Sequence, residues 1–185
     1  MARVLVLFAH PALHRSRVNS RLLDAARKVE GATVHDLYEA YPDFFIDVPR
    51  EKQLLLDHDV IVWQHPFFWY SCPALIKEWL DVVLEYGFAY GDDGTALVGK
   101  RAMTAITTGG GAEAYSPEGF NHFTIRQFLT PFEQTARLCG MTYEEPFIVH
   151  STHHLTEDEI SAHAERYAAR LDQLVAESST REEQP

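Results

Sequence analysis

The sequence predicts an α/β fold, in which a five-stranded parallel sheet carries helices on both faces. Short apolar runs of strand length alternate along the 185 residues with longer segments of helical periodicity. The runs are nearly continuous in Val, Leu and Ile, as expected for strands buried on both faces. The chain length suits one domain with a sizeable core. We therefore expect a single domain over residues 1–178 and a disordered tail over 179–185.

The first three strands lie in the first third of the chain. Residues 3–9 and 59–64 are apolar runs too short for typical helices, and residues 32–37 alternate in polarity. Two helices separate these strands: one with apolar residues at helical spacing over 18–29, and a short one over 49–57.

The next helix and strand are marked by proline and by a further apolar run. Pro73 stands where a first helical turn begins, and the apolar face that follows ends before Gly87. Residues 100–108 form the fourth expected strand. Thr130 and Glu133 have the spacing of a capping box, which predicts a helix start at that point.

The last strand and helix follow residue 144. Residues 145–150 predict a fifth strand, and Pro146 places it at a sheet edge because proline cannot donate a ladder hydrogen bond. Thr156 and Glu159 form a second capping box, so the last helix begins there. Its expected buried residues are Ile160, Ala164, Tyr167, Leu171 and Leu174.

Composition excludes several classes of protein. The net charge of −11 argues against a nucleic-acid binder or an anionic-membrane binder, because phosphate groups would repel it. No segment reaches the roughly 20 apolar residues that span a bilayer. Cys72 and Cys139 are far apart and outside any CxxC pattern, which favours reduced thiols in a cytoplasmic protein.

Three loops should meet at one edge of this sheet. For five such strands the order 2-1-3-4-5 is common, and ligands bind beyond the carboxyl ends of the strands. The loops at that edge are residues 10–19, 65–72 and 107–123.

The first loop has the features of a phosphate site. Ser16 and Asn19 stand at the start of a helix, where free N–H groups and the helix dipole attract anions. His10 adds a donor, and Arg15 and Arg17 add positive charge. The alternative is plain helix capping by Ser16 or Asn19.

The second loop has four aromatic residues in succession, Phe67 to Tyr70. Because they lie outside the sheet, they can form a surface on which a flat conjugated ring stacks. A hydrophobic plug or a subunit interface would use the same residues.

The third loop contains Gly109, Gly110 and Gly111 after two threonines. Such residues let backbone N–H groups approach a ligand closely, although a glycine run can also be slack in a surface loop. A phosphate site, an aromatic surface and a close-approach loop at one sheet edge together suit flavin mononucleotide (FMN).

The combined motifs resemble one family along the whole chain. They are FAHP (8–11), SxxN (16–19), LYxxYPDF (37–44), WQHPxxWYSxPxLxKxW (63–79), GxAYGxxGTALxGK (87–100) and TTGGG (107–111). They resemble the flavodoxin-like NAD(P)H:quinone oxidoreductases. The closest likeness is to bacterial ancillary proteins of glutathione-gated potassium-efflux systems.

The resemblance implies roles for particular residues. His10, Ser16 and Asn19 would hold the flavin phosphate, and Arg17 and Val18 of the same loop are also counted as cofactor-binding. The ring would be lined by Phe67, Phe68, Trp69 and Tyr70, and its polar edge by Thr107, Thr108, Gly109 and Gly110.

Two positions depart from the family pattern. Phe68 stands where many relatives have glutamine. Tyr115 matches the family's catalytic tyrosine, but Asn121 stands where the eukaryotic members have histidine, and His122 follows it. The expected catalytic residues are Tyr115 and His122, and either Asn121 or His122 would replace that histidine.

The resemblance implies an FMN-dependent oxidoreductase that takes hydride from NADH or NADPH and passes it to a quinone or similar electrophile. The alternatives are a regulatory subunit of a membrane potassium antiporter, at the inner membrane, and a one-electron carrier. Tyr90 matches an aromatic residue that reaches into a neighbouring subunit, so a homodimer is expected. The histidines at 150–154 are interpreted as part of a turn, and we expect no metal site.

Overall fold

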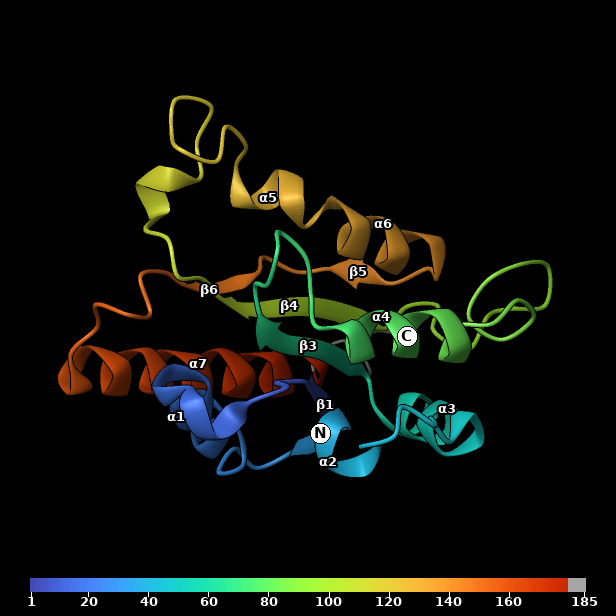
Figure 1. Cartoon of the computed structure of the whole chain (residues 1–185). Helices are drawn as coiled ribbons and strands as arrows, with labels where there is room; N and C mark the ends of the chain where they lie inside the picture. The colour runs from blue at the N-terminus through green and yellow to red at the C-terminus, as the bar shows by residue number, and fades with distance from the viewer. Residues whose placement is uncertain (180–185) are drawn as a thin grey trace.

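The computed structural model describes residues 1–179, and its centre is a parallel sheet (Figure 1). The strand order is β2-β1-β3-β4-β5, and β6 also pairs with β4. The strands are β1 (Val4–Phe8), β2 (Ala32–Asp36), β3 (Val60–Pro66), β4 (Arg101–Thr107), β5 (Thr142–Tyr143) and β6 (Phe147–Val149). The predicted α/β class and strand order are confirmed.

The fifth position of the sheet is divided into two short strands. β5 pairs with the beginning of β4 at Arg101 and Ala102, whereas β6 pairs with its end at Ala105 to Thr107. Pro146, which has no N–H to donate, lies between the two segments. The strand expected over 145–150 is therefore present at the predicted edge, but it is shorter, as β6. The short strand β5 was not predicted.

The helices form a layer on each face of the sheet. In Figure 1, α1 and α7 run along one face, and α4 lies on the other. The helices are α1 (Arg17–Ala26), α2 (Leu37–Ala40), α3 (Val48–Asp57), α4 (Ala74–Val83), α5 (Ile125–Phe128), α6 (Thr130–Leu138) and α7 (Glu157–Ser179), with short 3-10 turns η1 (Leu13–Arg15) and η2 (Ala112–Ala114).

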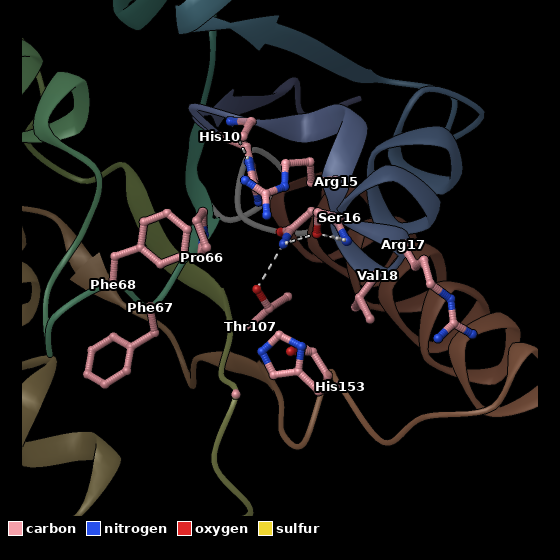
Figure 2. Close-up of a pocket in the computed structure, with 14 residues that line it drawn as sticks. His10, Arg15, Ser16, Arg17, Val18, Pro66, Phe67, Phe68, Thr107 and His153 are labelled. Atoms are coloured by element: carbon pink, nitrogen blue, oxygen red, sulfur yellow. Dashed lines mark hydrogen bonds between the residues drawn. The ribbon is translucent and has the colours of Figure 1, made fainter.

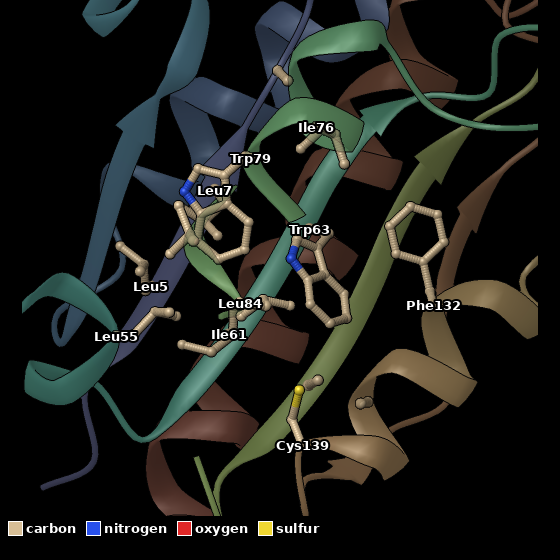
Figure 3. Packing of buried hydrophobic residues seen from close by; sticks show 14 of the residues in the cluster. Leu5, Leu7, Leu55, Ile61, Trp63, Ile76, Trp79, Leu84, Phe132 and Cys139 are labelled. Carbon is tan, nitrogen blue, oxygen red and sulfur yellow. The ribbon is translucent and has the colours of Figure 1, made fainter. Parts of the chain in front are cut away.

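Alternate residues of each strand enter two separate cores, because successive side chains of a strand point to opposite faces. In β3, Val60 and Val62 pack with residues of α1 and α7. Ile61 and Trp63 pack with α4 and α6, where the Trp63 and Phe132 ring centroids are 5.5 Å apart (Figure 3).

The helix predicted to start at residue 130 is confirmed, but the capping box expected there is wrong. Thr130 is already the first residue of α6, and its hydroxyl donates to the Gln127 carbonyl at 2.8 Å instead of capping. The capping box belongs to Thr124 and Gln127, which begin α5. The box of Thr156 and Glu159 is confirmed by hydrogen bonds in both directions.

The expected buried face of the last helix is confirmed: Ile160, Ala164, Tyr167, Leu171 and Leu174 are all buried. Ser179 closes α7, and the rest of the tail expected to be disordered, 180–185, lies outside the described residues. Among helices within residues 1–179, none is long and apolar enough to cross a membrane. Cys72 and Cys139 are free thiols.

Candidate functional site

A pocket of about 490 Å³ lies at the carboxyl ends of β1, β3 and β4 (Figure 2). This is the edge that the sequence predicts, and the volume is typical of small-molecule sites. All three expected loops contribute to it, together with the loop after β6. The lining residues are His10, Ala12, Arg15, Ser16, Arg17, Val18, Asn19, Pro66, Phe67, Phe68, Thr107, Gly109, Thr152 and His153.

The start of α1 forms one end of the pocket. The Ser16 hydroxyl caps the helix by accepting the Asn19 backbone N–H at 3.2 Å, so the capping interpretation of Ser16 is correct. Helix geometry leaves the N–H groups of Arg17 and Val18 without carbonyl partners inside the helix. Those two donors stand at the positive end of the helix dipole, an arrangement that suits an anion-binding position.

The Asn19 side chain connects this end to the third loop. Its Nδ2 donates to the Ser16 hydroxyl at 3.0 Å and to the Thr107 hydroxyl at 2.9 Å. Its Oδ1 is buried and, within residues 1–179, has no hydrogen-bond partner. A buried acceptor without a donor costs stability, so this oxygen suits a ligand that carries hydroxyl or N–H groups.

His10 is held in one tautomer. The Ala12 N–H donates to His10 Nδ1 at 3.0 Å, which makes Nδ1 the acceptor and leaves the proton on Nε2. Burial lowers the pKa of His10, and nearby His14 adds to the decrease. His10 is therefore a neutral side chain with one N–H donor available at the pocket.

The two arginines of the first loop have different orientations. The Arg17 guanidinium pairs with Glu157 at 2.6 Å and extends away from the pocket, so only its backbone serves the anion position (Figure 2). The exposed Arg15 side chain is among those that line the pocket. Arg15 thus supplies the local positive charge.

The four aromatic residues separate into two groups. Phe67 and Phe68 line the pocket, and the Phe68 ring lies 5.9 Å from that of His10. Trp69 is 92% exposed, and Tyr70 turns to stack on Phe128 at 5.2 Å. The separation arises because Trp69 and Tyr70 have φ of 49° and 62°, a conformation that bulky residues rarely adopt.

The glycine loop is crowded by the protein's own side chains. A Cβ on Gly109 would lie 3.3 Å from the His153 ring, and one on Gly110 would lie 3.4 Å from the Tyr115 ring. The contact at Gly109 is tighter than ordinary packing, whereas the one at Gly110 is ordinary van der Waals contact, so a side chain at Gly109 would push the loop and His153 apart. Thr107 and Gly109 line the pocket, whereas Thr108 is buried behind it.

Tyr115 lies beside the pocket wall rather than among its lining residues. Its ring centroid is 6.0 Å from that of Phe67 and 5.7 Å from that of His150. Burial raises the pKa of Tyr115, and the neighbouring Thr108 side chain opposes the increase. The phenol is thus protonated near neutral pH and can act as a hydrogen-bond donor.

The structure separates the two residues at 121 and 122. Asn121 Oδ1 accepts a hydrogen bond from the Tyr70 hydroxyl at 3.2 Å. His122 is exposed, has φ of 60° and does not line the pocket. The bond to Tyr70 therefore joins Asn121 to the aromatic residues of the second loop, and His122 has no such bond among the described residues.

The loop after β6 is the part of the site that sequence reasoning missed. It forms the expected turn, with the His154 N–H donating to the Ser151 carbonyl at 2.8 Å. Thr152 and His153 of that turn also line the pocket. The usable signal was its position, because it follows a parallel strand at the same sheet edge as the other three loops.

Tyr90 lies in a different region. Its ring packs against that of Tyr86 at 5.8 Å, and it lines a second cavity of about 480 Å³ together with both cysteines, Cys72 and Cys139. Within this chain Tyr90 does not reach the first pocket.

Comparisons with known proteins agree with this geometry. Residues 2–171 match a family described as having a flavodoxin-like fold. The chain is 50% identical over 165 residues to the glutathione-regulated potassium-efflux system ancillary protein KefG of Pectobacterium carotovorum, covering 89% of this chain and 90% of that protein.

Two solved structures are also similar. One is general stress protein 14 of Treponema denticola in complex with FMN, with 40% identity, a TM-score of 0.89 and coverage of 93% of this chain and 99% of that one. Another is an NADPH-quinone reductase of P. pentosaceus, with 32% identity, a TM-score of 0.82 and coverage of 90% and 95%.

Proposed function

The chain belongs to the family with a flavodoxin-like fold, and from this premise we propose that it is an FMN-dependent NAD(P)H:quinone oxidoreductase. One observation carries the proposal. A helix N-terminus, an aromatic wall and a glycine loop, from three distant parts of the sequence, line one pocket. The similar structures named for FMN and for quinone reduction support it.

The residues present fit FMN. The N–H groups of Arg17 and Val18, the Ser16 hydroxyl and the Nε2–H of His10 would hold the phosphate. Phe67 and Phe68 would stack on the flat ring, with Trp69 and Tyr70 outside them.

The polar edge of the ring would face Thr107 and Gly109, whereas Thr108 and Gly110, also expected there, do not line the pocket. The unpartnered Asn19 Oδ1 would accept a hydrogen bond from a hydroxyl of the ribityl chain.

Bound FMN would supply the redox chemistry, accepting a hydride from NADH or NADPH and delivering it to a quinone in a separate half-reaction. The protein would bind and orient the cofactor and the substrates, and it would exclude water from them. The Tyr115 phenol, protonated and half-buried, would offer a hydrogen-bond donor close to the glycine loop. His122 does not line the pocket, so we propose no role for it in this chemistry.

We also infer a homodimer. Trp69, Tyr86 and Phe120 are 92%, 65% and 85% exposed, and aromatic side chains of this kind are enriched at subunit interfaces. A second copy would cover them and bring its Tyr90 region toward the site. Multi-angle light scattering that shows an active monomer would contradict this inference.

A second candidate function is that of an ancillary subunit of a potassium-efflux system. It is favoured by the 50% identity to KefG, whose name states that role. With a net charge of −11, attachment would be to a transporter rather than to anionic lipid. Co-purification with a detergent-solubilised potassium-efflux transporter tests it, and retained quinone reductase activity would show that both roles coexist.

The cofactor assignment has a direct test. The purified protein, reconstituted with excess flavin and freed of unbound ligand, should release FMN on heating, as identified by mass. An unheated sample of the FMN-loaded protein should oxidise NADH or NADPH in repeated turnovers, under anaerobic conditions, only when a quinone is present. Release of FAD alone, or failure to retain any flavin, would reject the proposal.

A further inference from the structure

Tyr115 has a histidine neighbour from another part of the chain. The ring of His150, on the loop after β6, lies 5.7 Å from the Tyr115 ring with an interplanar angle of 38°. His150 is half-buried, unlike His122. Among the ring contacts of Tyr115 in the described structure, His150 is the one with an ionisable side chain.

A hydrogen-bonded clamp joins the loop of His150 to the glycine loop. The Thr108 N–H donates to the Val149 carbonyl at 2.8 Å, and the Thr152 N–H donates back to the Thr108 carbonyl at 3.1 Å. The Ser151 N–H donates to the Gly110 carbonyl at 3.0 Å. These bonds fix the backbone beneath Tyr115, whose hydroxyl lies 3.5 Å from the position of a Cβ on Gly110.

The side chain of Thr108 completes the clamp and determines the tautomer of His150. The Thr108 hydroxyl donates to the Gly110 carbonyl at 2.8 Å, so its only proton is used there. Its oxygen lies 3.0 Å from His150 Nδ1, and it can only accept in that contact. His150 must therefore carry a proton on Nδ1.

Several charged groups surround His150. Burial lowers the pKa of His150, whereas a hydrogen bond with the Gly110 backbone and the nearby Glu113 carboxylate raise it. His163 on α7 faces it as well, and His163 is itself in contact with Arg166. Because burial dominates, the neutral form with Nδ1–H is favoured near neutral pH.

We propose that His150 is a positioning residue for Tyr115, acting through Thr108 and the Gly110 carbonyl. No bond is formed or broken in this role. The Nδ1–H of His150 holds the Thr108 hydroxyl in one orientation, and that hydroxyl holds the glycine loop on which the Tyr115 hydroxyl lies. The inference rests on the proposed function, because Tyr115 is the donor being positioned.

Two substitutions of His150 separate this role from simple packing. His150→Asn keeps an N–H donor near the position of Nδ1 but loses the ring, whereas His150→Phe keeps the ring and loses the donor. We expect His150→Phe to slow reduction of bound FMN by NADH or NADPH about tenfold to a hundredfold, as for a misplaced catalytic group. His150→Asn should remain within about threefold of wild type, and so should the control His154→Asn, an exposed residue of the same loop that does not line the pocket.

A second measurement needs neither cofactor nor turnover. Long-range proton–nitrogen NMR spectra of the cofactor-free protein report which ring nitrogen of His150 is protonated. We expect Nδ1–H in the wild type and a shift toward Nε2–H in Thr108→Val. An Nε2–H form in the wild type would overturn the proposal.

The outcomes distinguish the two proposals. If wild-type protein binds no FMN or is not reduced by a nicotinamide, the proposed function fails, while the NMR result still tests the clamp. If wild type is reduced normally and His150→Phe matches it, the inference about His150 alone fails. If His150→Asn is slow and His150→Phe is as fast as wild type, the His150 ring serves packing, and the proposed hydrogen-bonding role is wrong.

Discussion

Asn19 at the start of α1 and Thr107 at the end of β4, 88 residues apart in sequence, are joined by a buried hydrogen bond of 2.9 Å. This bond links the α1 end of the pocket to the glycine loop, and Asn19 is only 2% exposed. The relative position of the two loops therefore depends on one amide and one hydroxyl.

Thr107→Val should weaken FMN binding. The substitution keeps the shape and removes the acceptor of the Asn19 amide, a loss of about 1 kcal/mol, or roughly fivefold in the FMN dissociation constant. Fluorescence titration of the cofactor-free protein measures it. Thr104→Val on the same strand is a matched control, because the Thr104 hydroxyl contacts Tyr143 rather than the pocket. Equal affinities for the two variants would contradict the role of the Asn19–Thr107 bond.

Tyr115→Phe should slow flavin reduction with little change in FMN affinity. Loss of one preorganised donor typically costs about 3 kcal/mol, or roughly a hundredfold in rate. The ring contacts with Phe67, Phe128 and His150 are kept in this variant. Stopped-flow reduction under anaerobic conditions gives the rate, and a rate equal to wild type would mean that Tyr115 serves only to pack these rings.

Glu51→Gln should destabilise the fold and change its response to acid. The fully buried Glu51 carboxylate accepts hydrogen bonds from His35 at 2.7 Å, Tyr41 at 2.5 Å and Trp79 at 2.8 Å. Burial tends to raise the pKa of Glu51, but these donors outweigh it and hold that pKa below its ordinary value. Removing the charge from such a network should cost about 3 kcal/mol.

The sign of the pH effect follows from that lowered pKa. The unfolded chain binds a proton at Glu51 more readily, so the stabilisation is fully present above about pH 4.3 and is lost as pH falls through the folded value. Urea unfolding of wild type should therefore show a stability decrease below about pH 4.3 that is smaller in Glu51→Gln. The exposed Glu30→Gln serves as the control, and identical pH slopes for wild type and Glu51→Gln would refute the assignment.

The sheet and most helices could be predicted because their signals are local. Buried strands such as 59–64 are short apolar runs, and the Thr156–Glu159 box marks α7 by adjacent hydrogen bonds. The spacing of Thr130 and Glu133 was a misleading signal, because the preceding turn of α5 already satisfies the Thr130 hydroxyl. A capping pattern cannot reveal which helix precedes it.

The site was predictable to the level of loops but not of side-chain directions. Ser16, Asn19 and Thr107 meet as expected at one sheet edge, since parallel topology requires it. Nothing local showed that Tyr70 would turn to Phe128, that Arg17 would pair with Glu157, or that His150 would contact Thr108. Those contacts form between segments whose distance apart is set only by the complete fold.

The measurement that tests the central claim most directly is an anaerobic two-step experiment on the FMN-loaded protein. NADH or NADPH, added at one equivalent without acceptor, should bleach the flavin absorbance in a single turnover. A quinone added afterwards should restore it and yield one equivalent of quinol, because the two half-reactions are separate. Flavin that stays oxidised with both nicotinamides, or reduced flavin that quinone does not reoxidise, would contradict the account.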